Sequence, residues 1–159
     1  MIRWLFIFPL IAASIHIFEE FAFPGGFRAW YVSYRPQIEK SLTTRRLVTF
    51  NLILLVACAS FAITGPRHGG TTTWLIAVSI IAWNSVFHLL GAFRTHRYSP
   101  GMISAILLYL PLTFGGFYLL LWHSVATLSS FAICFGIGTL YHVIAESDFR
   151  FKWAKRGLS

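Results

Sequence analysis

Charged residues are scarce in this chain: Asp, Glu, Lys and Arg make up 11% of its 159 residues, and only five residues are acidic. A soluble domain normally has about a quarter charged residues. Hydrophobic residues account for 57% of the chain. This composition argues against a soluble domain and is typical of an integral membrane protein.

Cysteine is also rare. Cys58 and Cys134 fall inside apolar runs at a spacing that suggests neither a metal clip nor a redox pair, so we interpret both as buried hydrophobic residues. The sequence contains no internal repeat and no low-complexity segment. We therefore expect a single domain over residues 1–159.

Long apolar runs dominate the sequence. An α-helix needs about 20 apolar residues to span the hydrocarbon core of a bilayer. Five segments meet this length or come close to it: residues 4–23, 47–64, 72–93, 102–122 and 124–147. We predict an all-α fold, a polytopic transmembrane bundle of about five helices.

The 13 basic residues give a formal net charge of +8, which taken alone would suggest a nucleic-acid partner. They lie in short loops and in the C-terminal tail, as membrane topology requires. With five spans, only Arg3 and Arg67 share a side with the N-terminus, and the other eleven lie opposite. The positive-inside rule then predicts an external N-terminus and a cytoplasmic C-terminus in the bacterial cytoplasmic (inner) membrane. We expect no nucleic-acid partner.

Three polar residues close the first apolar run: His16, Glu19 and Glu20. A charged side chain at the bilayer centre costs at least about 2.5–3.5 kcal/mol. Adjacent helical positions diverge by about 100°, so interfacial water would reach one of these carboxylates more readily than both. A bound metal, shared protons or a buried network of partners would offset the cost.

Two other predicted helices carry polar pairs at a similar depth. Asn84 and His88 are spaced i, i+4 in the third span, and His142 and Glu146 are spaced i, i+4 in the fifth. At a rise of about 1.5 Å per residue, most of these groups lie about 4–10 Å inside one boundary. Histidine and carboxylate ligands suit zinc, iron or manganese, so we predict a divalent metal site with zinc favoured. The predicted ligands are His16, Glu20, His88 and His142.

Ordinary structural roles are open alternatives for several polar residues. Glu146 is spaced i, i+4 from Arg150 and would pair with it equally well. A lone histidine near a helix end, such as His142, is more often a hydrogen-bonded interfacial group than a metal ligand. We interpret Asn51, one turn into the second span, as a hydrogen-bonding contact between helices.

Three motifs follow one another along the chain: His16-x-x-Glu19-Glu20, Asn84-x-x-x-His88 and Tyr98-Ser99-Pro100-Gly101. In these motifs, their order and its small polytopic size, the chain resembles the bacterial membrane family named for its H-x-x-E-E motif. The resemblance covers essentially the whole chain. That family has no established activity, so the resemblance implies a membrane topology and an enzymatic site built from the motif residues, and nothing further.

Tyr98 lies in the short loop between the third and fourth predicted spans. Its phenol would reach the mouth of the site and donate to a developing oxyanion, or it would anchor the loop at the membrane interface. Arg94 and Arg97 beside it would hold a phosphate or carboxylate headgroup, although topology alone also places arginines there.

We predict a metal-dependent integral-membrane enzyme that hydrolyses a lipid or another amphiphile at the cytoplasmic leaflet. In this hypothesis Glu20 is a ligand, and Glu19 or Glu146 deprotonates a bound water. Tyr98 or Asn84 stabilises the negative charge that develops.

Three other functions are compatible with the same residues. A non-haem iron oxidase or desaturase would use the same ligands, but membrane oxidases of that kind typically need more histidines. A metal-free acid–base isomerase would use Glu19, Glu20 and His88 as proton carriers. A proton- or cation-coupled transporter would use the carboxylates as a relay, and the absence of a repeat argues mildly against it.

Overall fold

The computed structural model describes residues 2–22 and 25–156, with side chains through Ala145. Every regular element in this part of the chain is helical. In chain order the elements are η1 (Arg3–Phe6), α1 (Phe8–Ala22), α2 (Gly26–Tyr34), η2 (Pro36–Ile38), α3 (Thr44–Thr64), α4 (Gly70–Thr95), α5 (Met102–Ser104), η3 (Ala105–Tyr109), α6 (Leu110–Trp122) and α7 (Leu128–Arg156).

Five helical segments are long and apolar enough to cross a membrane. They are Arg3–Ala22, Thr44–Thr64, Gly70–Thr95, Met102–Trp122 and Leu128–Ala145. Each coincides within a few residues with one of the five segments predicted from the sequence. The prediction of an all-α chain with about five membrane spans is therefore confirmed.

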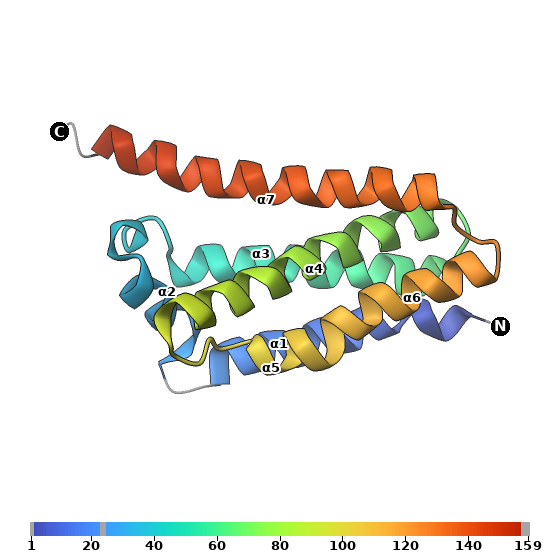
Figure 1. The fold of residues 1–159 in the computed structure, drawn as a ribbon, viewed down its shortest axis with the longest axis horizontal. Helices are drawn as coiled ribbons and strands as arrows, with labels where there is room; N and C mark the ends of the chain where they lie inside the picture. The colour runs from blue at the N-terminus through green and yellow to red at the C-terminus, as the bar shows by residue number, and fades with distance from the viewer. Residues whose placement is uncertain (1, 23–24, 157–159) are drawn as a thin grey trace.

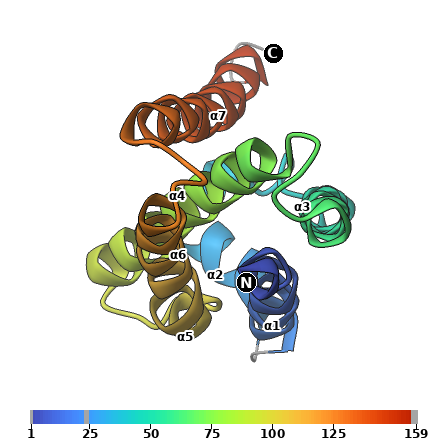
Figure 2. The same ribbon diagram turned by 90° about the vertical axis from the view of Figure 1, so that its right-hand side faces the viewer.

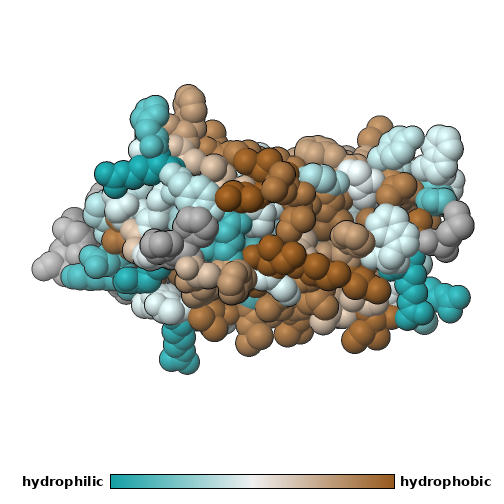
Figure 3. Space-filling view, turned by 90° about the horizontal axis from the view of Figure 1, so that it is seen from below, coloured by the Kyte–Doolittle hydropathy of each residue, from teal (hydrophilic) through white to brown (hydrophobic). Residues whose placement is uncertain are grey.

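Helix α4 lies at the centre of the bundle, between α7 and α1, with α3 and α6 beside it (Figure 2). In the most apolar stretch of α4, 50% of the residues are buried, against 11% in α3 and in α7. The outer helices expose large aliphatic side chains, including Leu52, Val56, Leu140 and Ile144. Figure 3 shows the resulting surface, in which an apolar band lies between two hydrophilic ends. Such a band is the surface that a bilayer requires.

The core is built on Trp74 of α4, which is fully buried. Its indole Nε1 donates a hydrogen bond of 3.1 Å to the carbonyl of Leu5. Gly116 of α6 packs directly on the ring, and an added Cβ at this position would lie 2.5 Å from it. Trp74 thus ties η1 and α6 to the central helix.

The connections alternate between the two ends of the bundle, as expected for five spans. Helix α2, η2 and the 96–101 link gather at one end, where α7 also finishes, and η1 starts at the other (Figure 1). We call the former the α2 end. The same end receives the last turns of α1 and α4, which carry two of the three sequence motifs.

The fourth span contains an irregular turn. Ala105–Tyr109 is a π-helix, in which the Leu110 N–H donates to the carbonyl of Ala105. Pro111 follows immediately, and a proline has no N–H to donate and crowds the carbonyl four residues before it. The wider π turn relieves that crowding. Tyr109, the last residue of this turn, packs against His16 of α1 in the site described next.

Candidate metal centre

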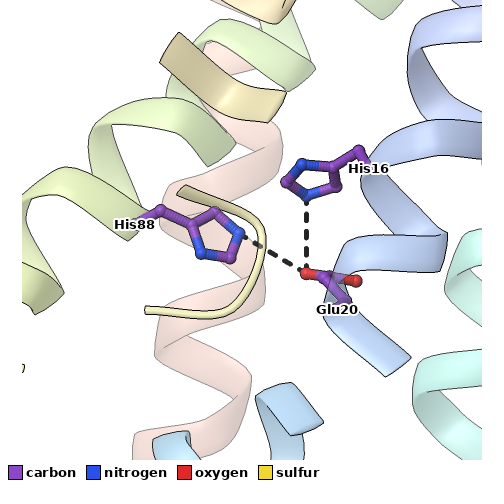
Figure 4. A group of neighbouring side chains, drawn as sticks. All are labelled: His16, Glu20 and His88. Atoms are coloured by element: carbon purple, nitrogen blue, oxygen red, sulfur yellow. Dashed lines mark ion pairs between the residues drawn. The ribbon is translucent and has the colours of Figure 1, made fainter. Parts of the chain in front are cut away.

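Three side chains from two helices converge near the α2 end. His16 and Glu20 come from α1 and His88 comes from α4 (Figure 4). Glu20 Oε1 lies 3.5 Å from His16 Nε2 and 3.4 Å from His88 Nε2. The three residues are only 2%, 7% and 0% exposed, and their potential ligand atoms all lie within 4.8 Å of one another.

The local sequence explains why α1 buries a histidine and a glutamate. The buried face of this helix consists of Pro9, Ala12, Ala13, His16 and Glu20. The first three residues are small or apolar and allow close packing. The two polar residues continue the same face at i, i+4 spacing, so the helix that buries the small residues also buries them.

Each histidine of the cluster is held by a serine. His16 Nδ1 lies 2.9 Å from Ser104 Oγ, and His88 Nδ1 lies 2.9 Å from Ser99 Oγ. Both Nε2 atoms are therefore turned towards Glu20. A histidine that binds a metal normally has its other ring nitrogen held by a hydrogen bond in this way.

Gly101 packs directly on the cluster. Its φ is +98°, in the region that favours glycine. An added Cβ would lie 2.8 Å from His16 Cε1, 2.9 Å from His88 Cε1 and 3.2 Å from Glu20 Cγ. Both the backbone conformation and the available space thus require glycine at the end of the Y-x-P-G motif.

Glu19 has a different environment from its neighbour in sequence. Its carboxylate accepts hydrogen bonds from the backbone N–H groups of Gly101 (3.1 Å), Ile103 (3.0 Å) and Ser104 (2.7 Å), and from the Tyr98 hydroxyl. Three of these four donors converge on Oε1, and the Ser104 N–H donates to Oε2. An anion at the start of a helix is also favoured by the helix dipole. Glu19 therefore anchors the start of the fourth span, and this placement does not support the prediction that it is a free base.

Tyr98 is committed to the same anchor. Burial and the nearby Glu19 carboxylate raise the pKa of the Tyr98 phenol well above its ordinary value. The phenol thus stays protonated and donates a hydrogen bond to Glu19. The predicted anchoring of Tyr98 at the membrane interface stays a prediction. A contact between Tyr98 and a reacting oxyanion stays a prediction.

Two asparagines contact the cluster. Asn84 Nδ2 lies 3.1 Å from His16 Nε2. The i, i+4 motif of α4 therefore supplies both a member of the cluster, His88, and a polar contact to His16. Asn51 Nδ2 donates to Glu20 Oε2 at 3.3 Å. This hydrogen bond joins two helices, as the sequence predicts for Asn51. Its acceptor is Glu20, one of the three residues of the cluster.

His142 is not part of the cluster. Its Nε2 lies 3.0 Å from the carbonyl oxygen of Ile80, which can only accept, so this nitrogen carries a proton and is not available to a metal. This placement does not support the prediction of His142 as a ligand: its depth is similar, but α7 turns it to the backbone of α4. Glu146 lies outside the described residues, because side chains are described only through Ala145.

The two predicted headgroup residues are exposed at the α2 end. Arg94 Nη1 donates to the Tyr34 hydroxyl at 3.4 Å, and Arg97 lies on the 96–101 link. Binding of a headgroup to either stays a prediction.

Ser99, Ser104 and Tyr109 belong to the site but were not predicted from the sequence. Ser99 lies inside the third motif, and Ser104 lies near the start of the fourth span at the depth used for the other residues. The depth of its hydroxyl group along the fourth span is the sequence signal that points to Ser104. No sequence signal identifies Tyr109, because the π turn decides its orientation.

Three buried side-chain polar atoms have no hydrogen-bond partner within the described part of the chain: Trp30 Nε1, His88 Nε2 and Tyr109 OH. All three belong to the surroundings of the cluster. The Tyr109 ring centroid is 4.4 Å from that of His16, and the Trp30 ring centroid is 6.5 Å from that of His88. Buried polar atoms are normally satisfied, so this concentration indicates a site built around a further polar group. The residues present therefore fit a metal ion.

A cavity of about 290 Å³ reaches the cluster from the α2 end. Glu20 of α1, Phe27 and Arg28 of α2, and Thr44 and Leu47 of α3 are among the residues that line it. The lining is partly polar and partly apolar, which suits an amphiphilic molecule. Glu20 is thus accessible although it is largely buried.

Comparisons with known proteins identify the family but no activity. No curated protein and no solved structure matches the chain. One family model matches residues 4–115, which include the three motifs and the whole His16–Glu20–His88 cluster but not α7. The chain belongs to the family described as proteins of unknown function with an HXXEE motif.

Proposed function

We propose that the protein is a metal-dependent integral-membrane enzyme that hydrolyses a lipid or another amphiphile. His16, Glu20 and His88 hold one divalent ion, with zinc favoured over iron or manganese. The observation that carries the proposal is the convergence of three buried potential ligand atoms: the Nε2 atoms of the two histidines and one carboxylate oxygen of Glu20. One of these atoms, His88 Nε2, has no hydrogen-bond partner among the described residues.

The donor set supports zinc in a catalytic rather than a structural role. Two histidines and one glutamate form a known catalytic zinc set, which leaves a coordination position open for water or substrate. A structural zinc site normally has four protein ligands. Among the described residues the cluster offers three.

A bound divalent ion would polarise a carbonyl or phosphoryl oxygen and lower the pKa of a bound water. The chain's own residues hold the donors in place. Ser104 and Ser99 orient the two imidazoles, and Asn51 holds Glu20 Oε2 so that Oε1 faces both histidines. Asn84 lies beside His16 Nε2 and would turn its amide to an incoming oxygen. Of the two predicted bases, Glu19 accepts hydrogen bonds from four donors, so we assign the role of base to Glu146.

The surroundings support an amphiphilic substrate. The cavity at Glu20 is lined by apolar side chains such as Phe27 and Leu47 and by the polar side chains of Arg28 and Thr44. Arg94 and Arg97 are exposed at the same end, where they would attract an anionic headgroup. Since eleven of the thirteen basic residues lie on that side, we place it at the cytoplasmic face of the bacterial inner membrane, with the N-terminus outside.

Metal analysis of the detergent-purified full-length protein tests the proposal. We expect about one zinc per chain in the wild type. Glu20→Gln should lose the metal because it removes a ligand, and Glu19→Gln should keep it because Glu19 only anchors the fourth span. The two variants are matched, since they make the same change at adjacent positions.

Each other outcome favours a different function. Stoichiometric iron would favour an oxidase or desaturase. Wild-type protein without metal would overturn the proposal and favour an acid–base isomerase or a proton or cation relay in a transporter. If Glu20→Gln retains metal fully while Glu19→Gln loses it, the assignment of the two carboxylates is wrong.

A further inference from the structure

Tyr109 closes one side of the candidate metal centre. It is the last residue of η3 and is 0% exposed. Its ring lies against the His16 imidazole, with centroids 4.4 Å apart and planes inclined by 32°. Tyr109 is therefore the aromatic wall next to one of the proposed ligands.

The hydroxyl of this tyrosine has no hydrogen-bond partner in the described part of the chain. A buried tyrosine usually finds a partner for its O–H, and a buried polar group left without one costs about 1–3 kcal/mol. Phenylalanine would fill nearly the same volume without this cost. Tyr109 also packs with the hydrophobic core of the bundle, and that packing alone gives no reason for a hydroxyl group at this position.

A second atom without a hydrogen-bond partner, His88 Nε2, belongs to the adjacent His16–Glu20–His88 cluster. His88 Nε2 faces Glu20, and the His88 ring centroid lies 5.1 Å from that of His16, on which Tyr109 packs. A metal ion at the centre would satisfy His88 Nε2, and an oxygen atom of a molecule bound to that ion would satisfy the Tyr109 hydroxyl.

We infer that the Tyr109 hydroxyl donates a hydrogen bond to an oxygen atom of the molecule bound at the His16–Glu20–His88 centre. The inference rests on the proposed function and narrows its substrate class. The substrate would present an electron-rich oxygen, the carbonyl oxygen of an ester or amide or the oxygen of a phosphate, on the side of the ion nearest His16. Tyr109 is then a catalytic residue, because its hydroxyl touches the reacting group.

A cobalt-substituted protein gives a direct test. Cobalt(II) in place of zinc makes the centre visible in the absorption spectrum, and acetohydroxamate is a small probe with two oxygen atoms that bind such ions. The dissociation constant of the probe would be measured for full-length wild type, Tyr109→Phe and Tyr118→Phe. Tyr118 is a matched control, since it lies in the same span but is 60% exposed.

We expect Tyr109→Phe to bind cobalt as the wild type does and to bind acetohydroxamate about 10- to 100-fold more weakly, the range for a hydrogen bond to a charged group. Tyr118→Phe should match the wild type. Equal probe affinity in Tyr109→Phe would overturn the inference and leave the proposed function intact. Loss of cobalt in Tyr109→Phe would also overturn it, because Tyr109 would then only support His16.

The wild type supplies the remaining outcomes. If it binds cobalt but not the probe, the inference fails, since the centre then has no position for an oxygen ligand. If it binds no metal, the proposed function fails and this inference fails with it.

Discussion

Helices α1 and α7 each carry a histidine and a glutamate at i, i+4 spacing, but the two pairs have different environments. In α1, His16 and Glu20 face a histidine of α4 and are held by serine and asparagine side chains. In α7, His142 contacts the backbone carbonyl of Ile80. The spacing places two residues on one face of a helix, and only the neighbouring helices decide whether that face meets a site.

The positions of the two helices explain the difference. Helix α1 packs against α2, α3, α5 and η3, so several elements send side chains to it. Helix α7 packs mainly on α4, and the polar contacts between these two helices include the hydrogen bond of 2.9 Å from Trp83 Nε1 to Thr139 Oγ1. Such hydrogen bonds are the ordinary polar contacts between membrane helices. The family match ends at residue 115 and thus covers α1 and α4 but not α7.

The largest expected effect comes from removing a histidine from each region. His88→Ala takes away one of three proposed ligands and should reduce metal affinity by more than the roughly 10- to 100-fold that loss of an outer hydrogen-bond partner costs. His142→Ala should leave metal affinity unchanged, because its imidazole Nε2 is held by the backbone carbonyl of Ile80 and not by the cluster. Metal content and competition with a chelator measure both. Equal loss of metal in the two variants would place His142 in the site after all.

A smaller effect is expected from adding one methyl group to each of two glycines of the fourth-span region. Gly101→Ala should push apart the imidazoles of His16 and His88, which lie 2.8 and 2.9 Å from the new Cβ, and weaken metal binding about 10- to 100-fold. Gly115→Ala is the matched control, since an added Cβ there meets no atom within 4 Å. Chelator competition on both variants tests the comparison. Unchanged affinity in Gly101→Ala would show that the loop does not shape the centre.

The smallest effect concerns the anchor beside the centre. Tyr98→Phe removes the hydrogen bond to Glu19 and should lower the free energy of unfolding by about 1 kcal/mol, since the tyrosine is partly exposed. Metal content should not change. Thermal unfolding in detergent, compared with the wild type, measures the loss.

The effect of Tyr98→Phe should depend on pH in a defined direction. The pKa of the Tyr98 phenol is raised above its ordinary value near 10, so the folded protein holds this proton more tightly than the unfolded chain. The stabilisation is complete below pH 10 and is lost as the pH rises through the raised pKa. The difference in melting temperature between wild type and Tyr98→Phe should therefore persist from pH 7 to pH 10 and decrease only above it. A difference that vanishes already at pH 8 would contradict this role of Tyr98.

Much of the site follows from depth along the predicted spans. His16, Glu20, Asn84 and His88 were expected at one level near one end of the bundle, and they meet there. Depth could not separate Glu19 from Glu20, because both lie at the same level and differ only by about 100° around the helix. The surrounding elements decide which way each carboxylate points. Glu19 points to the start of the fourth span, and Glu20 points to the histidines.

The sequence by itself determined that the chain is helical, that five segments are long enough to cross a membrane, and that its buried polar groups collect near one end. Hydrophobic runs and helical rise are local properties, so no other part of the chain is needed to predict them. The tertiary structure alone decided which carboxylate joins the cluster, which histidine is excluded, and that Ser99, Gly101, Ser104 and Tyr109 surround it. These outcomes depend on the rotation of each helix about its axis, which is set by packing against its neighbours and not by the sequence of that helix alone.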